Sequence, residues 1–159
     1  MNLDSLIKRG QPPWRPRPDA GDLDVWHEYE IPLVGTFRVC SDLVMFTQVL
    51  ETAKGLSAWA YTCVSVSDED QLADVTFPSA DELRSFVETL FRGREAVLVL
   101  ARDDRIIANW TRSLVKGGLV RTVEQFINDT MNQVSDSQQR VRAKFAGLDA
   151  APPELVSTP

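Results

Sequence analysis

The 159-residue sequence is poor in the side chains from which metal centres and covalent active sites are usually built. It has one histidine, His27, and two cysteines, Cys40 and Cys63, which do not form a CxxC pair. One histidine and two separated cysteines cannot supply a structural zinc site. No apolar run approaches the roughly 20 residues that span a bilayer. The sequence therefore predicts no metal, no cofactor and no membrane segment.

Catalytic and phosphate-binding motifs are also missing. The chain contains no nucleophile elbow G-x-S-x-G and neither of the common glycine-rich phosphate loops. A serine or cysteine triad would need His27, which falls inside a predicted strand. Residues 116–118, Lys-Gly-Gly, precede a predicted helix but are expected to be a connector, and the acidic residues 68–74 lack the pattern of an EF-hand loop. The sequence leaves enzymatic activity uncertain and favours a protein without it.

The beginning of the sequence, MNLDSLIKRG, has no apolar core of the kind that a secretory signal requires. A cytoplasmic location is therefore expected. Both cysteines are then predicted to be reduced and buried, packing as small apolar residues. A cross-strand disulfide or a reactive thiol stays open as an alternative.

The formal net charge of −6 is unevenly distributed. Residues 1–17 carry four cations and one anion, a net +3, so the rest of the chain carries −9. An acidic body repels phosphate backbones, which makes nucleic acid an unlikely partner for the folded domain. The same charge suits a basic protein partner or simple solubility.

Composition divides the chain into three parts. Four of its nine prolines lie between positions 12 and 18, and such a stretch favours extended polyproline II structure. We therefore predict a flexible, basic, proline-rich arm over 1–20, with a short helix over 2–9. A single domain is expected over 21–147, followed by a disordered tail over 148–159.

Alternating and doubly apolar runs predict six strands, and a capping box marks the clearest helix. Ser79 and Glu82 form that box, and five apolar residues then repeat at helical spacing up to Gly93, which predicts a helix over 80–92. Residues 67–74 are expected to be an acidic loop. A second helix is expected from about 119 to 145. The predicted strands are 24–31, 36–40, 43–50, 56–66, 95–101 and 105–111.

Short turns between consecutive strands predict antiparallel pairing. The predicted fold is α+β, with about six strands in the order (short α)-β-β-β-β-α-β-β-α and the helices packed on one face of the sheet. This order is similar to that of small acidic secretion-chaperone-like domains. The likeness is one of topology, and no motif defines a family.

Two helices can cover only part of a six-stranded sheet. Ala58 and Ala60 would let a helix approach closely, so we place them beneath the helices and place Trp59, Tyr61 and Cys63 on the far face. An uncovered aromatic face of that extent usually marks an interaction site. The alternatives are that the sheet curls or that the N-terminal arm folds over it.

The arm is the second candidate interaction surface, because Trp14, Arg15 and Arg17 stand in a stiff proline setting. The leading hypothesis is a non-catalytic protein-binding module of chaperone, adaptor or immunity type that acts through the apolar sheet face. Homodimerisation through that face would be a natural consequence. One alternative is a small enzyme or ligand-binding protein with a pocket between sheet and helices that contains His27, Tyr29, Tyr61 or Cys63. The other is a regulatory nucleic-acid contact through the arm.

Overall fold

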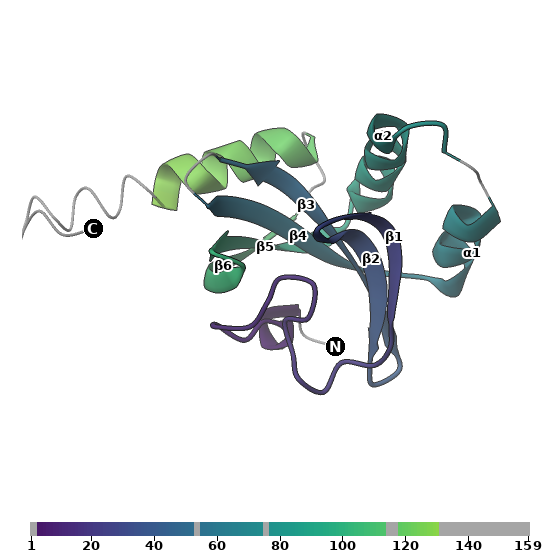
Figure 1. The fold of residues 1–159 in the computed structure, drawn as a ribbon, viewed down its shortest axis with the longest axis horizontal. Coiled ribbons are helices and arrows are strands. Elements are labelled where there is room, and N and C mark those ends of the chain that lie inside the picture. Colours follow the sequence, from purple (N-terminus) through teal and green to yellow (C-terminus); the bar gives the residue numbers. More distant parts are fainter. Residues whose placement is uncertain (1–2, 53–54, 75–76, 114–117, 131–159) are drawn as a thin grey trace, which may run out of the picture. The chain divides into compact units, whose positions relative to one another are not determined.

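A computed structural model describes residues 3–52, 55–74, 77–113 and 118–130. Residues 1–123 form one compact unit and residues 124–159 a second. The first unit contains the sheet, whose strands are labelled in Figure 1. Within the described part of the chain, no helix is long and apolar enough to cross a membrane. The predicted tail over 148–159 and most of the second predicted helix lie outside the described residues.

A six-stranded antiparallel sheet forms the centre of this unit. Each strand pairs with its neighbours in the chain, in the spatial order β1-β2-β3-β4-β5-β6. This meander confirms the predicted α+β class and the antiparallel pairing. Short connections dictate that pairing for every neighbouring pair except β4 and β5, whose connection spans residues 65–94. The strands are β1 (Leu23–Tyr29), β2 (Ile31–Val39), β3 (Asp42–Glu51), β4 (Leu56–Val64), β5 (Glu95–Arg102) and β6 (Arg105–Ser113).

The helix α2 (Ala80–Phe91) forms where the capping box predicts it. The Ser79 hydroxyl accepts a hydrogen bond from the Glu82 backbone amide at 3.2 Å, which satisfies one of the free amides of the first turn. Leu83, Val87 and Leu90 lie on one side of the helix and are buried. This apolar stripe attaches α2 to the sheet.

The helix α1 (Val66–Asp74) is a correction, because the sequence analysis expects a loop there. Ser65 and Asp68 cap each other: the Asp68 amide donates to the Ser65 hydroxyl at 3.1 Å, and the Ser65 amide donates to the Asp68 carboxylate at 2.8 Å. This is a capping box with aspartate in place of the usual glutamate. Only Leu72 of α1 is buried, so the helix has almost no apolar stripe by which a sequence could reveal it.

Polar contacts attach α1 to the rest of the unit. Asp68 forms an ion pair with Arg94 at 2.9 Å, and Arg94 also donates to the Cys63 carbonyl at 3.0 Å. The Thr36 hydroxyl of β2 donates to the Glu69 carboxylate at 2.8 Å. These bonds place two of the four acidic side chains of α1 against protein and leave Asp70 and Asp74 exposed.

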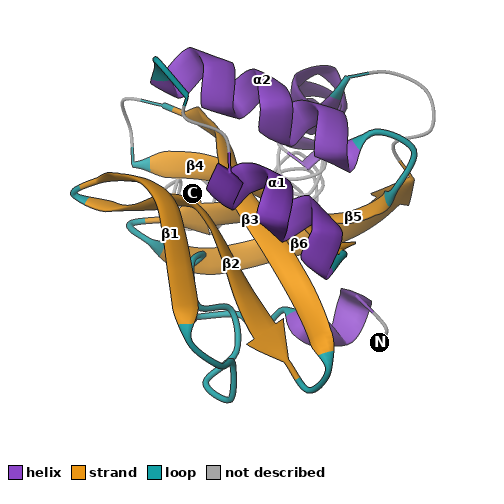
Figure 2. Cartoon of the chain, turned by 90° about the vertical axis from the view of Figure 1, so that its right-hand side faces the viewer, coloured by secondary structure: helices purple, strands orange, loops and turns teal. Residues whose placement is uncertain are grey.

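The two faces of the sheet are covered by different parts of the chain. Figure 2 shows α1 and α2 on one side of the sheet and the short N-terminal helix η1 (Leu3–Leu6) on the other. Ala58 and Ala60 are fully buried, in line with their expected position beneath the helices. A helix also begins at residue 119, as predicted, and is described as far as residue 130.

Candidate functional site

The aromatic sheet face that the sequence analysis expects to be open is covered. Trp59 and Tyr61 are both 0 % exposed and belong to one buried cluster with Leu3, Leu6 and Phe46. The expectation of an uncovered apolar surface is therefore wrong, and the alternative in which the arm folds over the sheet is the one observed. The protein-binding role predicted for these residues is untested and stays a prediction.

The N-terminal segment seals this face with side chains and with its backbone. The rings of Trp14 and Trp59 lie 6.3 Å apart between centroids, and the Tyr61 hydroxyl donates to the Pro13 carbonyl. At the outer edge of β6, the Gly10 amide donates to the Ile106 carbonyl at 2.9 Å and the Ile106 amide donates to the Gln11 carbonyl at 3.0 Å. Residues 3–20 therefore pack on the sheet rather than forming a separate arm.

The two predicted arginine contacts are engaged within this segment. Arg15 donates to the Ala20 carbonyl at 3.1 Å, and Arg17 forms a bidentate pair with Asp19 at 2.7 and 2.8 Å. The hydrogen bonds to Asp19 raise the pKa of Arg17, and the pKa of Asp19 is lowered in turn. Both arginines thus stabilise the turn that leads from the N-terminal segment into β1.

The two cysteines differ in their surroundings. Cys63 is half-buried and packs against the Trp59 cluster, and burial raises the pKa of its thiol, with a smaller contribution from Asp42. Cys40 is exposed in the turn after β2, where its φ is 55°. The prediction that both thiols are buried is therefore wrong for Cys40. Neither cysteine forms a disulfide.

A groove of about 340 Å³ lies on the other side of the sheet, between β1 and the two helices. We name it the β1–α groove. Trp26 and His27 of β1 form one wall, and the helices and their connection form the other. The Trp26 indole donates to Thr36 at 3.4 Å, which fixes that wall to β2. The second wall comprises Leu72, Ala73, Phe77, Ser79, Ala80 and Leu83.

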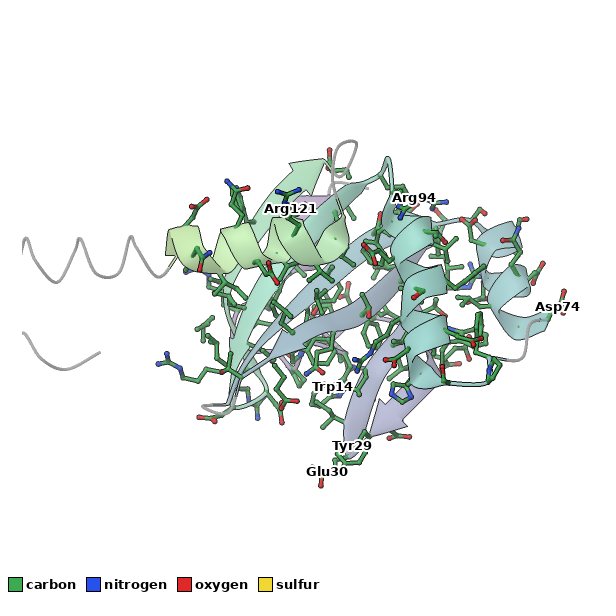
Figure 3. All side chains as sticks on the ribbon, turned by 90° about the horizontal axis from the view of Figure 1, so that it is seen from above. Trp14, Tyr29, Glu30, Asp74, Arg94 and Arg121 are labelled. Carbon is green, nitrogen blue, oxygen red and sulfur yellow. The ribbon has the colours of Figure 1, made fainter. Side chains whose placement is uncertain are left out.

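Two of the three elements that form this groove, β1 and α1, carry charge of one sign, whereas α2 also contains Arg84. Residues 21–31 and 65–74 together contain eight carboxylates and no lysine or arginine. Glu28 and Asp74 each follow a lining residue in the chain and are exposed. Tyr29, the last residue of β1, is 73 % exposed. Figure 3 shows Tyr29 and Glu30 projecting at one end of β1, and Asp74 at the end of α1.

Sequence reasoning missed this groove because one of its walls is α1. The residue pair Ser65 and Asp68 carries the signal that could have revealed the helix, as a capping box in which aspartate is allowed at the fourth position. His27 does lie in a strand, as predicted, but its neighbours across the groove follow only from the fold.

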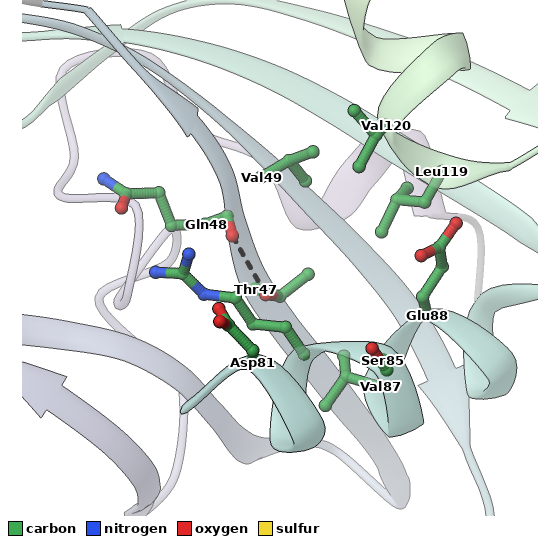
Figure 4. Close-up of a pocket in the computed structure, with 10 residues that line it drawn as sticks. Thr47, Gln48, Val49, Asp81, Ser85, Val87, Glu88, Leu119 and Val120 are labelled. Carbon is green, nitrogen blue, oxygen red and sulfur yellow. Dashed lines mark hydrogen bonds between the residues drawn. The ribbon is translucent and has the colours of Figure 1, made fainter. Parts of the chain in front are cut away.

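A second pocket, of about 310 Å³, lies between β3, α2 and the start of the helix at residue 119 (Figure 4). We name it the β3–α2 pocket. The register between β3 and β4 shifts between Gln48 and Leu50, which places a bulge at this point. The Thr47 hydroxyl donates to the Gln48 carbonyl at 3.1 Å. The lining residues are Thr47, Gln48, Val49, Asp81, Arg84, Ser85, Val87, Glu88, Leu119 and Val120.

Two hollows thus lie between the sheet and the helices, where the alternative of an enzyme or ligand-binding protein places its pocket, but only one of the four expected residues lines either of them. Of the four polar groups proposed for it, His27 lines the β1–α groove, whereas Tyr61 and Cys63 belong to the cluster beneath the N-terminal segment. Tyr29 is exposed at the end of β1. Among the described residues, no three histidine, cysteine or acidic side chains converge in a way that could hold a metal ion.

Comparison with known proteins assigns neither a family nor a function to this chain. The chain matches no protein-family model, no curated protein and no solved structure.

Proposed function

We propose that this chain is a protein-binding module that takes a basic segment of a partner protein into the β1–α groove. One observation carries the proposal: a partly exposed groove, lined mostly by apolar residues, lies between β1 and the two helices, and two of these three elements, β1 and α1, contain carboxylates and no lysine or arginine. Protein binding is the class of function predicted from the sequence, but the proposed binding surface is now the β1–α groove instead of the apolar sheet face. The basic class of partner follows from the charge of that surface.

The apolar part of the groove would supply the anchor. Leu72 and Leu83 are buried at its base, whereas Ala73 and Ala80 are exposed small residues that leave room above them. Small exposed residues beside an aromatic wall are suited to receive one large apolar side chain of a partner. Burial of such an anchor commonly dominates the affinity of a protein interface.

The acidic residues beside the groove would make binding selective for basic partners and would speed their association. Glu28 and Asp74 are exposed and follow lining residues of opposite walls, so a cationic side chain flanking the anchor would have a carboxylate near either wall. Exposed charges of this kind steer an oppositely charged partner more than they tighten the final complex. Affinity should therefore fall as salt is added.

A direct test uses a fluorescent peptide that alternates arginine with leucine and phenylalanine, and a second peptide in which glutamate replaces arginine. We expect the basic peptide to bind with an affinity that weakens between about 50 and 500 mM salt. The acidic peptide should not bind. Fluorescence anisotropy measures both. Equal binding of the two peptides, or no binding of the basic one, would contradict the proposal.

The matched variants are Ala73→Arg and Ser67→Arg. Both place an arginine on an exposed position of α1, but only residue 73 lines the groove. We expect Ala73→Arg to weaken binding of the basic peptide by about tenfold or more, which corresponds to about 1.4 kcal/mol. Ser67→Arg controls for the change in net charge and should alter the affinity by less than about twofold. Equal losses in the two variants would place the peptide elsewhere.

A further inference from the structure

We infer that the β3–α2 pocket is a separate site for a small zwitterion with an apolar side chain, which is the chemistry of a free apolar α-amino acid. This inference does not depend on the protein-binding proposal, because the two sites share no lining residue. It rests on the order of charges along α2, on the apolar floor of the pocket and on the bulge in β3.

Three charged side chains of alternating sign line the pocket from one face of α2. Asp81, Arg84 and Glu88 are spaced by three and four residues, which places them on the same side of the helix. Such spacing normally allows ion pairs along a helix. Among the described residues, however, no ion pair joins Arg84 to either carboxylate. A ligand in the pocket would therefore meet these groups without displacing an ion pair between them.

The order of these charges selects the ligand. An anion would meet Arg84 together with two repelling carboxylates, and a cation would meet two carboxylates together with the repelling guanidinium. A zwitterion satisfies both signs, with its carboxylate on the Arg84 guanidinium and its ammonium on Glu88 or Asp81. Guanidinium and carboxylate match as a fork of two hydrogen bonds, which makes arginine well suited to this contact.

The rest of the pocket is suited to a short apolar side chain. Val49, Val87, Leu119 and Val120 line it, and Val120 is 41 % exposed although it is aliphatic. The volume of about 310 Å³ is at the lower end of the range for small-molecule sites. A single amino acid fits this space, whereas a folded partner does not.

The bulge in β3 positions the residues that line the strand side of the pocket. Val49 has no partner in β4, because Gln48 pairs with Trp59 and Leu50 pairs with Ala58. A bulge of this kind bends the strand and redirects side chains, and bulges are common beside binding sites. Here Thr47, Gln48 and Val49 all line the pocket from consecutive positions. Figure 4 shows Thr47 and Val49 opposite Ser85 and Leu119.

The test is calorimetric titration of the full chain with L-leucine and three analogues that remove one or both charges. The analogues are N-acetyl-L-leucine, which lacks the ammonium, L-leucinamide, which lacks the carboxylate, and N-acetyl-L-leucinamide, which lacks both. We expect L-leucine to bind saturably and each analogue to bind at least about tenfold more weakly. Equal binding of N-acetyl-L-leucinamide would assign the pocket to an uncharged peptide segment and overturn the proposal, as would the absence of leucine binding.

The variants Arg84→Gln and Arg92→Gln separate the pocket from general charge effects. Arg84 lines the pocket, whereas Arg92 is exposed just after α2 and does not. Arg84→Gln should abolish the preference for L-leucine over L-leucinamide, and Arg92→Gln should leave it unchanged. Ser85→Phe, at an exposed lining position, should block binding by filling the pocket while the circular dichroism spectrum stays the same. Leucine binding that survives both Arg84→Gln and Ser85→Phe would refute the site.

The same variants distinguish failure here from failure of the protein-binding proposal. Arg84→Gln should leave binding of the basic peptide in the β1–α groove intact, and Ala73→Arg should leave leucine binding intact. If Arg84→Gln removed both activities, the two sites would not be independent, and this inference would be wrong.

Discussion

At the scale of single residues, Tyr61 carries the most direct link between the sheet and the segment that covers it. Its hydroxyl donates to the Pro13 carbonyl in a buried setting. Tyr61→Phe keeps the ring and leaves that carbonyl without its partner, so we expect unfolding free energy to fall by about 1–3 kcal/mol in urea denaturation. Tyr29→Phe removes a hydroxyl that is largely exposed and should change stability very little. Equal effects of the two variants would contradict the contact.

The same residue predicts a loss of stability in alkali. Burial raises the pKa of Tyr61 well above its ordinary value of about 10, because the phenolate form cannot be solvated inside the cluster. A raised pKa means that Tyr61 loses its proton at a lower pH in the unfolded chain than in the folded chain. The contribution of Tyr61 to the free energy of unfolding is therefore fully present below about pH 10 and falls as the pH rises further. Tyr61→Phe should lack this dependence. Near-ultraviolet absorbance should show one phenol that ionises only as the wild-type chain unfolds.

Gly35 is a position where the space for a side chain is already occupied. A Cβ atom there would lie 2.6 Å from the Asp24 carbonyl oxygen and 2.9 Å from the Phe46 ring. Gly35→Ala should therefore destabilise the protein by about 1–3 kcal/mol through overpacking. At Gly21 the nearest atom would be the Arg38 carbonyl oxygen at 3.4 Å, so Gly21→Ala is the matched control with a small effect. Thermal unfolding of both variants checks the difference.

At the scale of elements, the attachment of α1 depends on Asp68. This carboxylate caps the helix at Ser65 and pairs with Arg94. Partial burial opposes ionisation, but the hydrogen bonds from Ser65 and Arg94 outweigh it and lower the pKa of Asp68. Asp68→Asn should reduce unfolding free energy at neutral pH by about 1 kcal/mol, with Asp70→Asn as the exposed control on the same helix.

The sign of the pH dependence provides a further check on that prediction. Because the folded pKa is depressed, the contribution of Asp68 is present above the unfolded value of about 4 and is lost as the pH falls through the folded value. The stability difference between wild type and Asp68→Asn should therefore shrink in acid. A difference that stays constant down to acid unfolding would show that the charge of Asp68 is not what stabilises α1.

These elements differ in how far the sequence predicts them. The strands and α2 follow from local signals, since alternation and the Ser79 capping box act over a few residues. The helix α1 escapes prediction because it buries one side chain, Leu72, and is attached mainly by polar bonds to distant residues such as Thr36 and Arg94. The β1–α groove is therefore beyond sequence reasoning, and so is the bulge at Val49, which depends on the pairing with β4.

At the scale of the whole compact unit, the two surfaces predicted to bind other molecules pack against each other. From the sequence, an aromatic sheet face and an N-terminal arm are expected to be separate interaction sites, whereas the fold packs one against the other within one chain. A proline-rich segment can do this without a strand ladder, because Leu3, Leu6 and Trp14 supply apolar contacts while few amides need partners. What this leaves exposed is the acidic surface of β1 and α1, which is why the proposed partner is basic.

This arrangement predicts that a single change in the N-terminal segment recreates the open face. Leu6 is 0 % exposed within η1, whereas its neighbour Ser5 is exposed. Leu6→Asp places a charge in the apolar cluster and should cost about 3 kcal/mol or more, and Ser5→Asp controls for the charge. The freed Trp59 face should then bind an apolar fluorescent dye and promote association detectable by light scattering. If Leu6→Asp instead matched Ser5→Asp in stability, dye binding and mass, the N-terminal segment would not be what covers the sheet. The hypothesis of an uncovered aromatic face would then stand again.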